Sequence, residues 1–483
     1  MTYENKDLAV VPEAQRNWTV GNYAALWIGM SMCIPTYMLA SSMIEGGMNW
    51  WQALATVFLG NVIVLVPMIL NGHAGARYGI PFPVLARASF GILGANIPAM
   101  LRAIVACGWF GIQSWIGGAA LYRLVAVWAP GIRNLPPFFP QALGMETGVG
   151  IAFFTFWALN MVVIYFGINS IRRLLSIKAV VLPMISLALL LWAISAVDGL
   201  GPILARPARW QNSAEFWAYF FPALTGVVGF WATISLNIPD FTRYASSQRA
   251  HILGQAIGLP TSMTAFAFVG IAVTSATALI YGEMIWDPVI LSEKFTSPLL
   301  VTAAMLAIVV STLATNIAAN IVSPANDFAN LAPRWISFRT GGYITGVIGV
   351  VIMPWRLVSD PTGYIFKWLI AYSALLGPIG GILIVDYYLV RRCTLDVDAL
   401  YSNHGRYWYT AGFNWRAIVA LIAGILPSIP GFLVAIKAIG PDAAPGYLNA
   451  LYHYAWFVGF GVAGSLYFIF QKSSGEDDHK VRR

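Results

Sequence analysis

Charged residues are scarce in this sequence. Asp, Glu, Lys and Arg make up 10% of the 483 residues, whereas soluble globular proteins contain about 25%. Hydrophobic residues make up 58%, against about 45–50% in soluble proteins. These proportions exclude a soluble enzyme, a nucleic-acid-binding domain and a disordered chain. They predict a polytopic helical protein of the lipid bilayer, because each spanning helix needs roughly 20 apolar residues.

Cysteine is scarce too, and none of the five histidines lies well inside an apolar run. The cysteines are odd in number and are not spaced as metal ligands, so we expect no disulfide framework; they are Cys33, Cys107 and Cys393. A membrane hydrolase or metalloprotease needs clustered His, Asp or Glu within its helices. The sequence therefore predicts a protein that is not an enzyme and has no cofactor. It also predicts a neutral substrate, bound by aromatic rings and amides.

Apolar runs bounded by Gly, Pro and charges predict twelve spans. They cover 22–42, 50–71, 96–128, 149–167, 175–197, 214–238, 255–281, 298–324, 335–354, 364–390, 416–437 and 449–470. About 19 of the 28 Lys and Arg fall in the N-terminal segment, the even-numbered loops and the C-terminal tail, where basic residues mark the cytoplasmic side. These loop charges include Arg172, Arg173, Lys178, Arg391 and Arg392. We expect a multi-pass protein of the cell membrane with both termini in the cytoplasm.

Two spans contain Ile-Pro after a stretch rich in Gly, Ser and Thr, at Ile34-Pro35 and Ile238-Pro239. Proline removes a backbone donor, and glycine lets a helix open at little steric cost. Each site lies in the first helix of a five-helix block, so the second block enters the membrane from the opposite side. Paired broken helices in inverted repeats mark a midplane binding site in secondary transporters. The alternative is that these residues only kink the spans.

This organisation divides the chain into five expected parts. They are a cytoplasmic N-terminal segment at 1–21, inverted repeats at 22–197 and 214–390, two further helices at 416–470, and a cytoplasmic tail at 471–483.

Polar side chains inside the third span indicate what could bind there. Gln113 follows Trp109 by four residues, so the two share one helix face. A carboxamide offers one acceptor and two donors, which match the edge of a lactam or ureide, and the indole can stack on a planar ring. The alternative is that Gln113 bonds a neighbouring helix and Trp109 packs in the core.

The sixth and eighth spans are also rich in polar residues. The sixth contains Trp231 and, after it, Thr233, Ser235 and Asn237. In the eighth, Asn316 and Asn320 are spaced i, i+4, and Ser311 and Thr315 form an adjoining stripe. Oxygens at this density beside a broken helix are suited to a small hard cation such as Na⁺.

The sequence resembles the nucleobase–cation symporter-1 family, which includes allantoin, uracil, cytosine and hydantoin transporters. The resemblance spans nearly the whole chain and rests on motifs at 71–75, 79–83, 87–91, 94–98, 108–113, 237–243, 316–324, 377–378 and 386–392. It is strongest for the allantoin, uracil and hydantoin branch. It implies an all-α LeuT-type fold of twelve transmembrane helices, with two inverted five-helix repeats and two C-terminal helices.

The resemblance also implies the residues of a substrate site. They are Trp109, Gln113, Trp231, Asn320, Cys33, Asn316 and Phe230. Trp109 and Trp231 would enclose the substrate ring between them. Gln113 and Asn320 would hydrogen-bond its amide edge. Cys33 stands where the family has an amide ligand, so the identity of the ring stays open.

A sodium site is implied in the same way. Its ligands would be the carbonyls of Gly29, Met32 and Ser311 and the hydroxyl of Thr315. The position of a second hydroxyl holds Ala314, which cannot ligate a cation. Both Na⁺ and H⁺ therefore stay open as the coupling ion.

Together these features predict a symporter that imports a neutral planar ring amide, such as allantoin, hydantoin or uracil. Its partners would be this small molecule, a coupling cation and the lipid bilayer, and not nucleic acid. One alternative is an ion-independent facilitator or channel for the same solutes. Another is a family member specific for a different nucleobase or a thiamine-type compound.

Overall fold

The computed structural model describes residues 5–166, 168–357 and 363–473. Side chains at 142, 168–177, 179–181 and 364–366 lie outside the described set, so Arg172 and Arg173 are not placed. Within the described residues the chain is helical, and its β pairing consists of the isolated bridges Trp18–Ala245 and Thr410–Phe413.

The helices form the twelve expected passes. The first five passes are α1 (Val20–Ser31) with α2 (Ile34–Glu45), α3 (Trp50–Tyr78), α5 (Asn96–Trp128), α6 (Thr147–Phe166) and α7 (Ile168–Ala196). The next five are α9 (Ser213–Phe230) with α10 (Ala232–Asn237), α12 (Gln248–Tyr281), α14 (Pro298–Asn320) with α15 (Val322–Leu331), α16 (Phe338–Val351), and η6 (Gly363–Leu369) with α18 (Ile370–Ile384) and η7 (Val385–Val390). The last two are α19 (Trp415–Ile425) with α20 (Ile429–Ala435), and α21 (Gly446–Tyr452) with α22 (Ala455–Ser473).

Seven helices among the described residues are each long and apolar enough to cross a bilayer. The bent pairs α1–α2 and α21–α22 raise this number to nine. Among the described residues of α7, Leu182–Ala196 is a further apolar stretch. Short helices complete the connections: α4 (Phe82–Phe90), α8 (Leu200–Leu204), α11 (Pro239–Thr242), α13 (Pro288–Leu291) and α17 (Pro354–Leu357).

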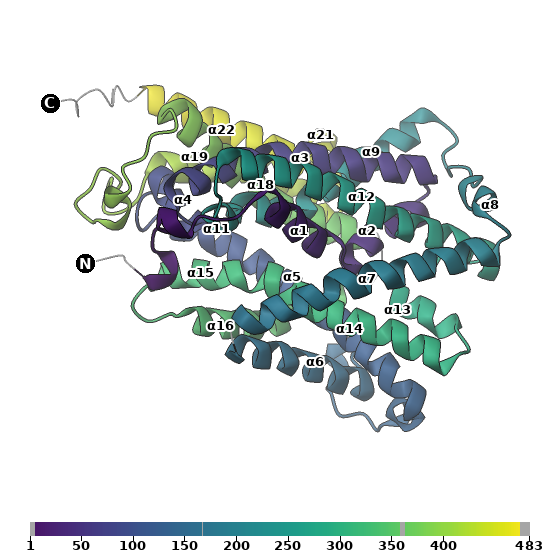
Figure 1. Ribbon diagram of the computed structural model, residues 1–483. Coiled ribbons are helices and arrows are strands. Elements are labelled where there is room, and N and C mark those ends of the chain that lie inside the picture. Colours follow the sequence, from purple (N-terminus) through teal and green to yellow (C-terminus); the bar gives the residue numbers. More distant parts are fainter. Residues whose placement is uncertain (1–4, 167, 358–362, 474–483) are drawn as a thin grey trace.

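The passes pack as two groups that meet along the middle of the molecule (Figure 1). The first group consists of α1, α2, α3, α9, α10, α11 and α12, and the second of α5, α6, α14, α15 and α16. Helix α7 crosses between them and contacts α12 and α1 of the first group and α14 of the second. Helix α18 contacts α9 and α5, so it also joins the groups.

Both stretches with an Ile-Pro pair are broken in the structure, the first before Pro35 and the second at Trp231 and again at Ile238, before Pro239. The first pass bends by 58° between Ser31 and Ile34, directly before Pro35. In the sixth pass the helix is interrupted at Trp231 (φ −101°, ψ 4°), well before Ile238-Pro239. Pro239 begins α11, because a proline at a first helical position loses no hydrogen bond.

The second pass is longer than the predicted span 50–71, since α3 continues to Tyr78. Its polar end is helical because it packs on the sixth pass. The Thr242 hydroxyl donates to the Gly72 carbonyl at 2.8 Å, and a Cβ on Gly75 would lie 2.8 Å from the Pro239 Cα. The helix ends at Gly79, whose φ of 73° is the left-handed conformation that glycine adopts readily.

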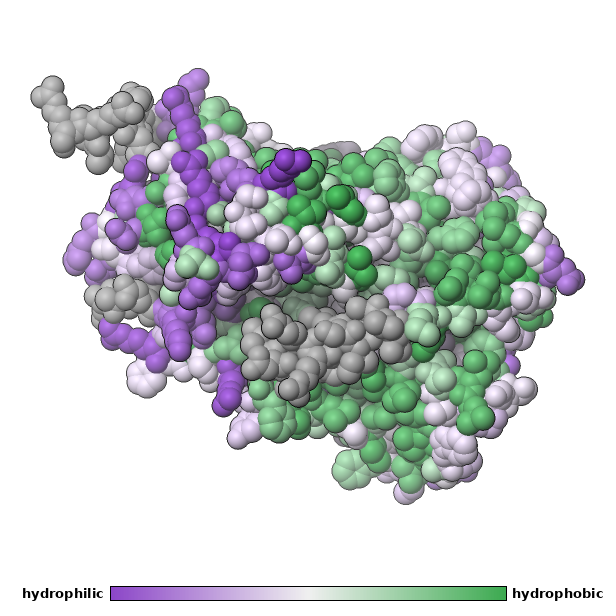
Figure 2. Space-filling view, in the orientation of Figure 1, coloured by the Kyte–Doolittle hydropathy of each residue, from purple (hydrophilic) through white to green (hydrophobic). Residues whose placement is uncertain are grey.

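Both chain ends lie at the same end of the bundle, which we call the terminal end (Figure 1). Hydrophilic residues gather at this end, while hydrophobic residues cover much of the remaining surface (Figure 2). An apolar flank of this kind is what a bundle of membrane-spanning helices presents to lipid.

Candidate binding site

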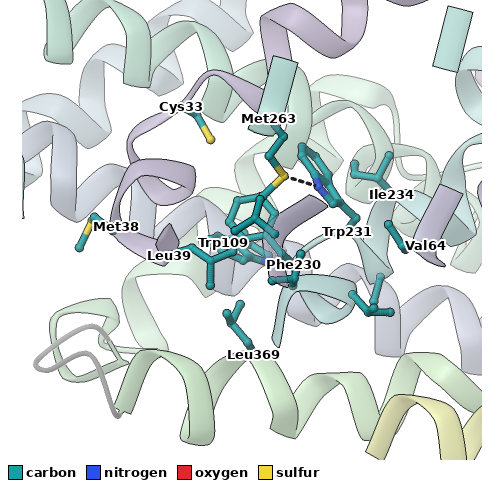
Figure 3. Close-up of a cluster of buried hydrophobic side chains, with 14 of the residues drawn as sticks. Cys33, Met38, Leu39, Val64, Trp109, Phe230, Trp231, Ile234, Met263 and Leu369 are labelled. Carbon is teal, nitrogen blue, oxygen red and sulfur yellow. Dashed lines mark hydrogen bonds between the residues drawn. The ribbon is translucent and has the colours of Figure 1, made fainter. Parts of the chain in front are cut away.

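The candidate site lies where the two groups of helices meet. Three aromatic rings from three elements line it: Trp109 of α5, Phe230 at the end of α9, and Trp231 in the break that follows. The Phe230 ring centre is 5.0 Å from that of Trp109 and 5.0 Å from that of Trp231, with edge-on geometry in both pairs (Figure 3). All three side chains are buried.

The Trp231 ring is held by the first group of helices. Its indole N–H donates to Asn61 Oδ1 of α3 at 3.0 Å and lies 2.9 Å from Met263 Sδ of α12 (Figure 3). The Trp27 ring of α1 lies edge-on to it at 5.1 Å. These contacts join the break at Trp231 to α1, α3 and α12.

The Phe230 ring packs against the same two indoles that the resemblance assigns to the substrate ring. The resemblance implied that Trp109 and Trp231 enclose a planar ring, and in this structure the Phe230 side chain touches both indoles. A ligand that stacks on both would have to displace the Phe230 ring from one of them. The enclosing role of the two tryptophans stays a prediction.

Gln113 is the polar group of the site with an open hydrogen-bonding capacity. Its side chain is 4% exposed, and its Oε1 has no hydrogen-bond partner among the residues that the structure describes. A buried acceptor without a partner costs about 1–3 kcal/mol. One turn away, the Trp109 indole N–H donates to the Tyr372 hydroxyl at 3.2 Å, which orients the ring. The spacing predicted from the sequence therefore brings together an oriented ring and an unused amide acceptor.

Asn316 connects three helices. Its amide nitrogen lies 3.2 Å from the Phe110 carbonyl, 3.1 Å from Ser114 Oγ and 3.2 Å from Asn160 Oδ1. Its Oδ1 accepts a hydrogen bond from the Asn320 amide at 3.0 Å. Asn316 thus packs α14 against α5 and α6 and fixes the side chain of Asn320.

Asn320 lies close to the turn of α5 that carries Trp109. Helices α14–α15 and α5 run antiparallel, because Asn316 meets Phe110 and Ser114 while Asp327 meets Arg102 further along. Asn320 falls between these two contacts. It is 6% exposed, so both amides implied for the substrate edge are buried on the second group.

Cys33 belongs to the same cluster of buried side chains as the three rings (Figure 3). It precedes α2 at the break of the first pass, is 3% exposed, and its thiol lies 3.4 Å from Thr36 Oγ1. The thiol is a weak donor and a weak acceptor. The first group therefore contributes Phe230, Trp231 and this thiol, and the second contributes Trp109 and the amides.

Lys178 was counted among the loop charges although it falls within the predicted span 175–197, and the structure bears out the span. Lys178 lies within α7, and its side chain is 2% exposed. Its ammonium group donates hydrogen bonds to the Gly29 carbonyl of α1 and to the Thr315 hydroxyl of α14. Both oxygens belong to the implied sodium site. The position of Lys178 at the start of an apolar run was the only signal in the sequence, and it equally fits a charge at a helix end.

The residues at this position do not form an oxygen cage for Na⁺. Thr315 also donates its hydroxyl hydrogen to the Ser311 carbonyl at 2.9 Å, and the buried Ala314 offers no side-chain oxygen. Met32 follows α1 at the break of the first pass, and its role as a ligand stays a prediction. The Lys178 ammonium donates to the Gly29 carbonyl and the Thr315 hydroxyl, two of the oxygens that the resemblance implied as sodium ligands.

At the terminal end, polar contacts join the two groups of helices. The Asp240 carboxylate accepts hydrogen bonds from the Phe82 backbone N–H of α4 at 2.9 Å and from the Ser323 hydroxyl of α15 at 2.7 Å. Asn237 donates to the same Ser323 hydroxyl. All these side chains are buried. The motifs at 237–243 and 316–324, far apart in sequence, therefore meet and link the groups at this end.

Comparison with known proteins identifies the family. Residues 10–459 match the family described as permease for cytosine/purines, uracil, thiamine and allantoin. The chain belongs to this permease family. It is 42% identical over 475 residues to the purine-uracil permease NCS1 of Arabidopsis thaliana, covering 98% of this chain and 78% of that protein. It is 37% identical over 468 residues to the allantoin permease of Bacillus subtilis (strain 168), covering 97% and 93%.

A solved structure of similar fold is Mhp1, a nucleobase-cation-symport-1 family transporter. Its closed conformation with bromovinylhydantoin bound superposes with a TM-score of 0.79 at 24% identity, covering 98% of this permease and 96% of Mhp1. This likeness confirms the expected LeuT-type fold with its five-plus-five inverted repeat. The relatives are permeases, which agrees with the prediction that the chain is not an enzyme. The bounds of the repeats, 22–197 and 214–390, stay a prediction.

Proposed function

We propose that this permease imports a neutral planar ring amide across the cell membrane by symport with a cation, with alternating access between the two groups of helices. The substrate class is that of uracil, allantoin and hydantoin. Support comes from the names of the relatives, the uracil and allantoin permeases, and from the bromovinylhydantoin bound in Mhp1.

One observation carries the proposal: the buried Gln113 Oε1 has no hydrogen-bond partner among the described residues. A ring N–H of a lactam or ureide would donate to this oxygen, and the Gln113 amide nitrogen would donate to the adjacent ring carbonyl. Trp109 would stack on the ring from one turn away, and Asn320, fixed by Asn316, would bond its far edge. Methylation of the ring nitrogen should abolish recognition, because it leaves the buried acceptor unpaired.

The proposed orientation places both termini in the cytoplasm. The terminal end carries much of the hydrophilic surface (Figure 2), and basic residues of short loops gather on the cytoplasmic side of membrane proteins. The polar links of Asp240 and Ser323 would then close the cytoplasmic side of the site.

Uptake by the purified protein in proteoliposomes tests this function. Radiolabelled uracil, allantoin and hydantoin are compared under imposed gradients of Na⁺ or pH. We expect one of them to accumulate above its external concentration. Gln113→Ala should raise the half-saturation concentration roughly 10- to 100-fold, since a hydrogen bond lost from a buried site costs about 1–3 kcal/mol.

Gln211→Ala is the matched control, because Gln211 is an exposed amide away from the site. Unchanged uptake in both Gln113→Ala and Asn320→Ala would refute the assigned site. Equilibration without accumulation under every gradient would indicate an ion-independent facilitator. Uptake of another nucleobase or a thiamine-type compound alone would replace the substrate class.

A further inference from the structure

We propose that the ammonium group of Lys178 permanently fills the cation position beside the broken first helix, so that transport by this permease does not use Na⁺. This inference rests on the proposed function and concerns its coupling ion. It reverses the expectation, drawn from the polar eighth span, that the site holds a sodium ion.

The first argument is geometric. Gly29 lies near the end of α1, and Thr315 lies on α14. The ammonium group of Lys178, on α7, donates one hydrogen bond to the Gly29 carbonyl and one to the Thr315 hydroxyl. The side chain is 2% exposed, so its charge has left bulk water. A buried charge of this kind persists only where hydrogen bonds compensate the loss of solvation. The Gly29 carbonyl and the Thr315 hydroxyl provide that compensation, as they would for a metal ion.

The second argument concerns electrostatics. Two positive charges within a few ångströms of each other repel strongly in a buried site, where the effective dielectric constant is far below that of water. A sodium ion bound to Gly29 and Thr315 would be repelled by the Lys178 ammonium. It would also have to compete for two oxygens that already accept hydrogen bonds from Lys178. Ala314 supplies no oxygen in exchange. The tethered ammonium and a bound Na⁺ therefore exclude each other.

The third argument is that the ammonium already makes the connection that a bound ion would make. Lys178 joins α1 of the first group, α7 that crosses between the groups, and α14 of the second. These elements must move relative to one another in alternating access. A cation tethered to α7 cannot leave with the substrate, so the Na⁺ gradient has no carrier at this position.

The experiment removes the tethered cation and restores the missing oxygen. The melting temperature of the purified protein is measured as NaCl replaces choline chloride at constant ionic strength. We expect no Na⁺-specific shift in the wild type. The double variant Lys178→Ala/Ala314→Ser should gain one, because a ligand that binds only the folded state stabilises it in proportion to RT ln(1 + [L]/Kd). Potassium serves as the reference ion.

Lys367→Ala/Ala314→Ser is the matched control, since Lys367 is an exposed lysine of η6. It should behave like the wild type. A Na⁺-specific stabilisation of the wild type, or uptake that falls more than about tenfold when choline replaces Na⁺, would overturn the proposal. Both wild-type measurements are informative even if the double variant does not fold.

Failure of the proposed function would give a different pattern. In that case no ring amide raises the melting temperature of the protein, and none is taken up with any cation. The response of the melting temperature to Na⁺ still tests the role of Lys178. A wild type that is stabilised by a ring amide without Na⁺ supports both proposals.

Discussion

The Ser323 hydroxyl of α15 donates a hydrogen bond to the Asp240 carboxylate of α11 at 2.7 Å, across the junction of the two groups of helices. Asn237 of α10 donates to the same hydroxyl. The second carboxylate oxygen of Asp240 accepts from the Phe82 backbone N–H at the start of α4. This arrangement links the two groups of helices at the terminal end, and the proposed alternating access would have to break it.

Ser323→Ala removes that contact. A hydrogen bond to a charged group is worth about 1.5–3 kcal/mol, so the equilibrium should shift roughly tenfold or more toward the state open at the terminal end. The alkylation rate of Cys33 by a hydrophilic maleimide, applied from that side, measures the shift. Ser41→Ala is the control, since Ser41 is a buried hydroxyl of α2 that takes no part in the contact between Ser323 and Asp240. An unaltered rate in Ser323→Ala would remove the gating role.

The ion pair between Arg102 and Asp327 governs stability. Nη1 and Oδ2 are 2.8 Å apart, and both side chains are fully buried between α5 and α15. Arg102→Met or Asp327→Leu alone leaves the other charge unpaired, which costs about 3–5 kcal/mol. Both single variants should therefore melt well below the wild type.

The double variant Arg102→Met/Asp327→Leu should recover most of that loss, because apolar replacement of a whole buried pair is often neutral. Recovery is favoured here because Arg102 Nε and Nη2 and Asp327 Oδ1 have no hydrogen-bond partners. Thermal melting of the four proteins in detergent checks this. A double variant that melts lower than both single variants would contradict it.

Cys33 should report on substrate binding. Its thiol lies in the candidate site and is nearly inaccessible, so a bound ring should slow its alkylation several-fold. Cys393, which lies outside the spans, provides an internal control. Burial raises the pKa of the Cys393 thiol, and the nearby Arg77 guanidinium opposes that rise. The alkylation rate of Cys393 should rise with pH, because the thiolate is the reactive form. Added substrate should leave that rate unchanged.

The labelling is measured by mass spectrometry in a Cys107→Ala background, with and without saturating uracil, allantoin or hydantoin. Equal protection of Cys33 and Cys393 would indicate a general stabilisation of the protein and not occupancy of the site.

Phe230 should set the size of the substrate. Its ring touches both Trp109 and Trp231, so Phe230→Ala frees space between the indoles. We expect this variant to prefer bulky ring-substituted hydantoins or uracils over the parent compounds by about tenfold relative to the wild type, since a buried apolar contact is worth about 1–3 kcal/mol. Competition against labelled substrate measures the preference. Phe230→Leu, which keeps most of the volume, should change it little.

Much of the site follows from local sequence. Trp109 and Gln113 share a face because their spacing matches one helical turn, and the structure keeps that face buried at the junction of the groups. The break in the first pass was predicted from Gly, Ser and Pro35, since these residues act within one turn. The break at Trp231 was not, because contacts with Asn61 and Met263, distant in sequence, accompany it.

Asn316 shows the limit of spacing arguments. Its i, i+4 relation to Asn320 indicated a shared role, and the structure does join the two amides. However, the pattern could not show that the remaining contacts of Asn316 lead to Phe110, Ser114 and Asn160. These partners lie on other helices, so its packing role depends on how the helices assemble.

The sequence by itself determined that the chain is a helical membrane protein of twelve passes, because apolar run length and scarcity of charge are properties of each segment alone. Its motifs also determined the permease family. Only the tertiary structure showed that the Lys178 side chain is buried and which oxygens accept its hydrogen bonds. Its partners, Gly29 and Thr315, are 149 and 137 residues away, and the cost of burying an ammonium group is met only where such distant oxygens converge.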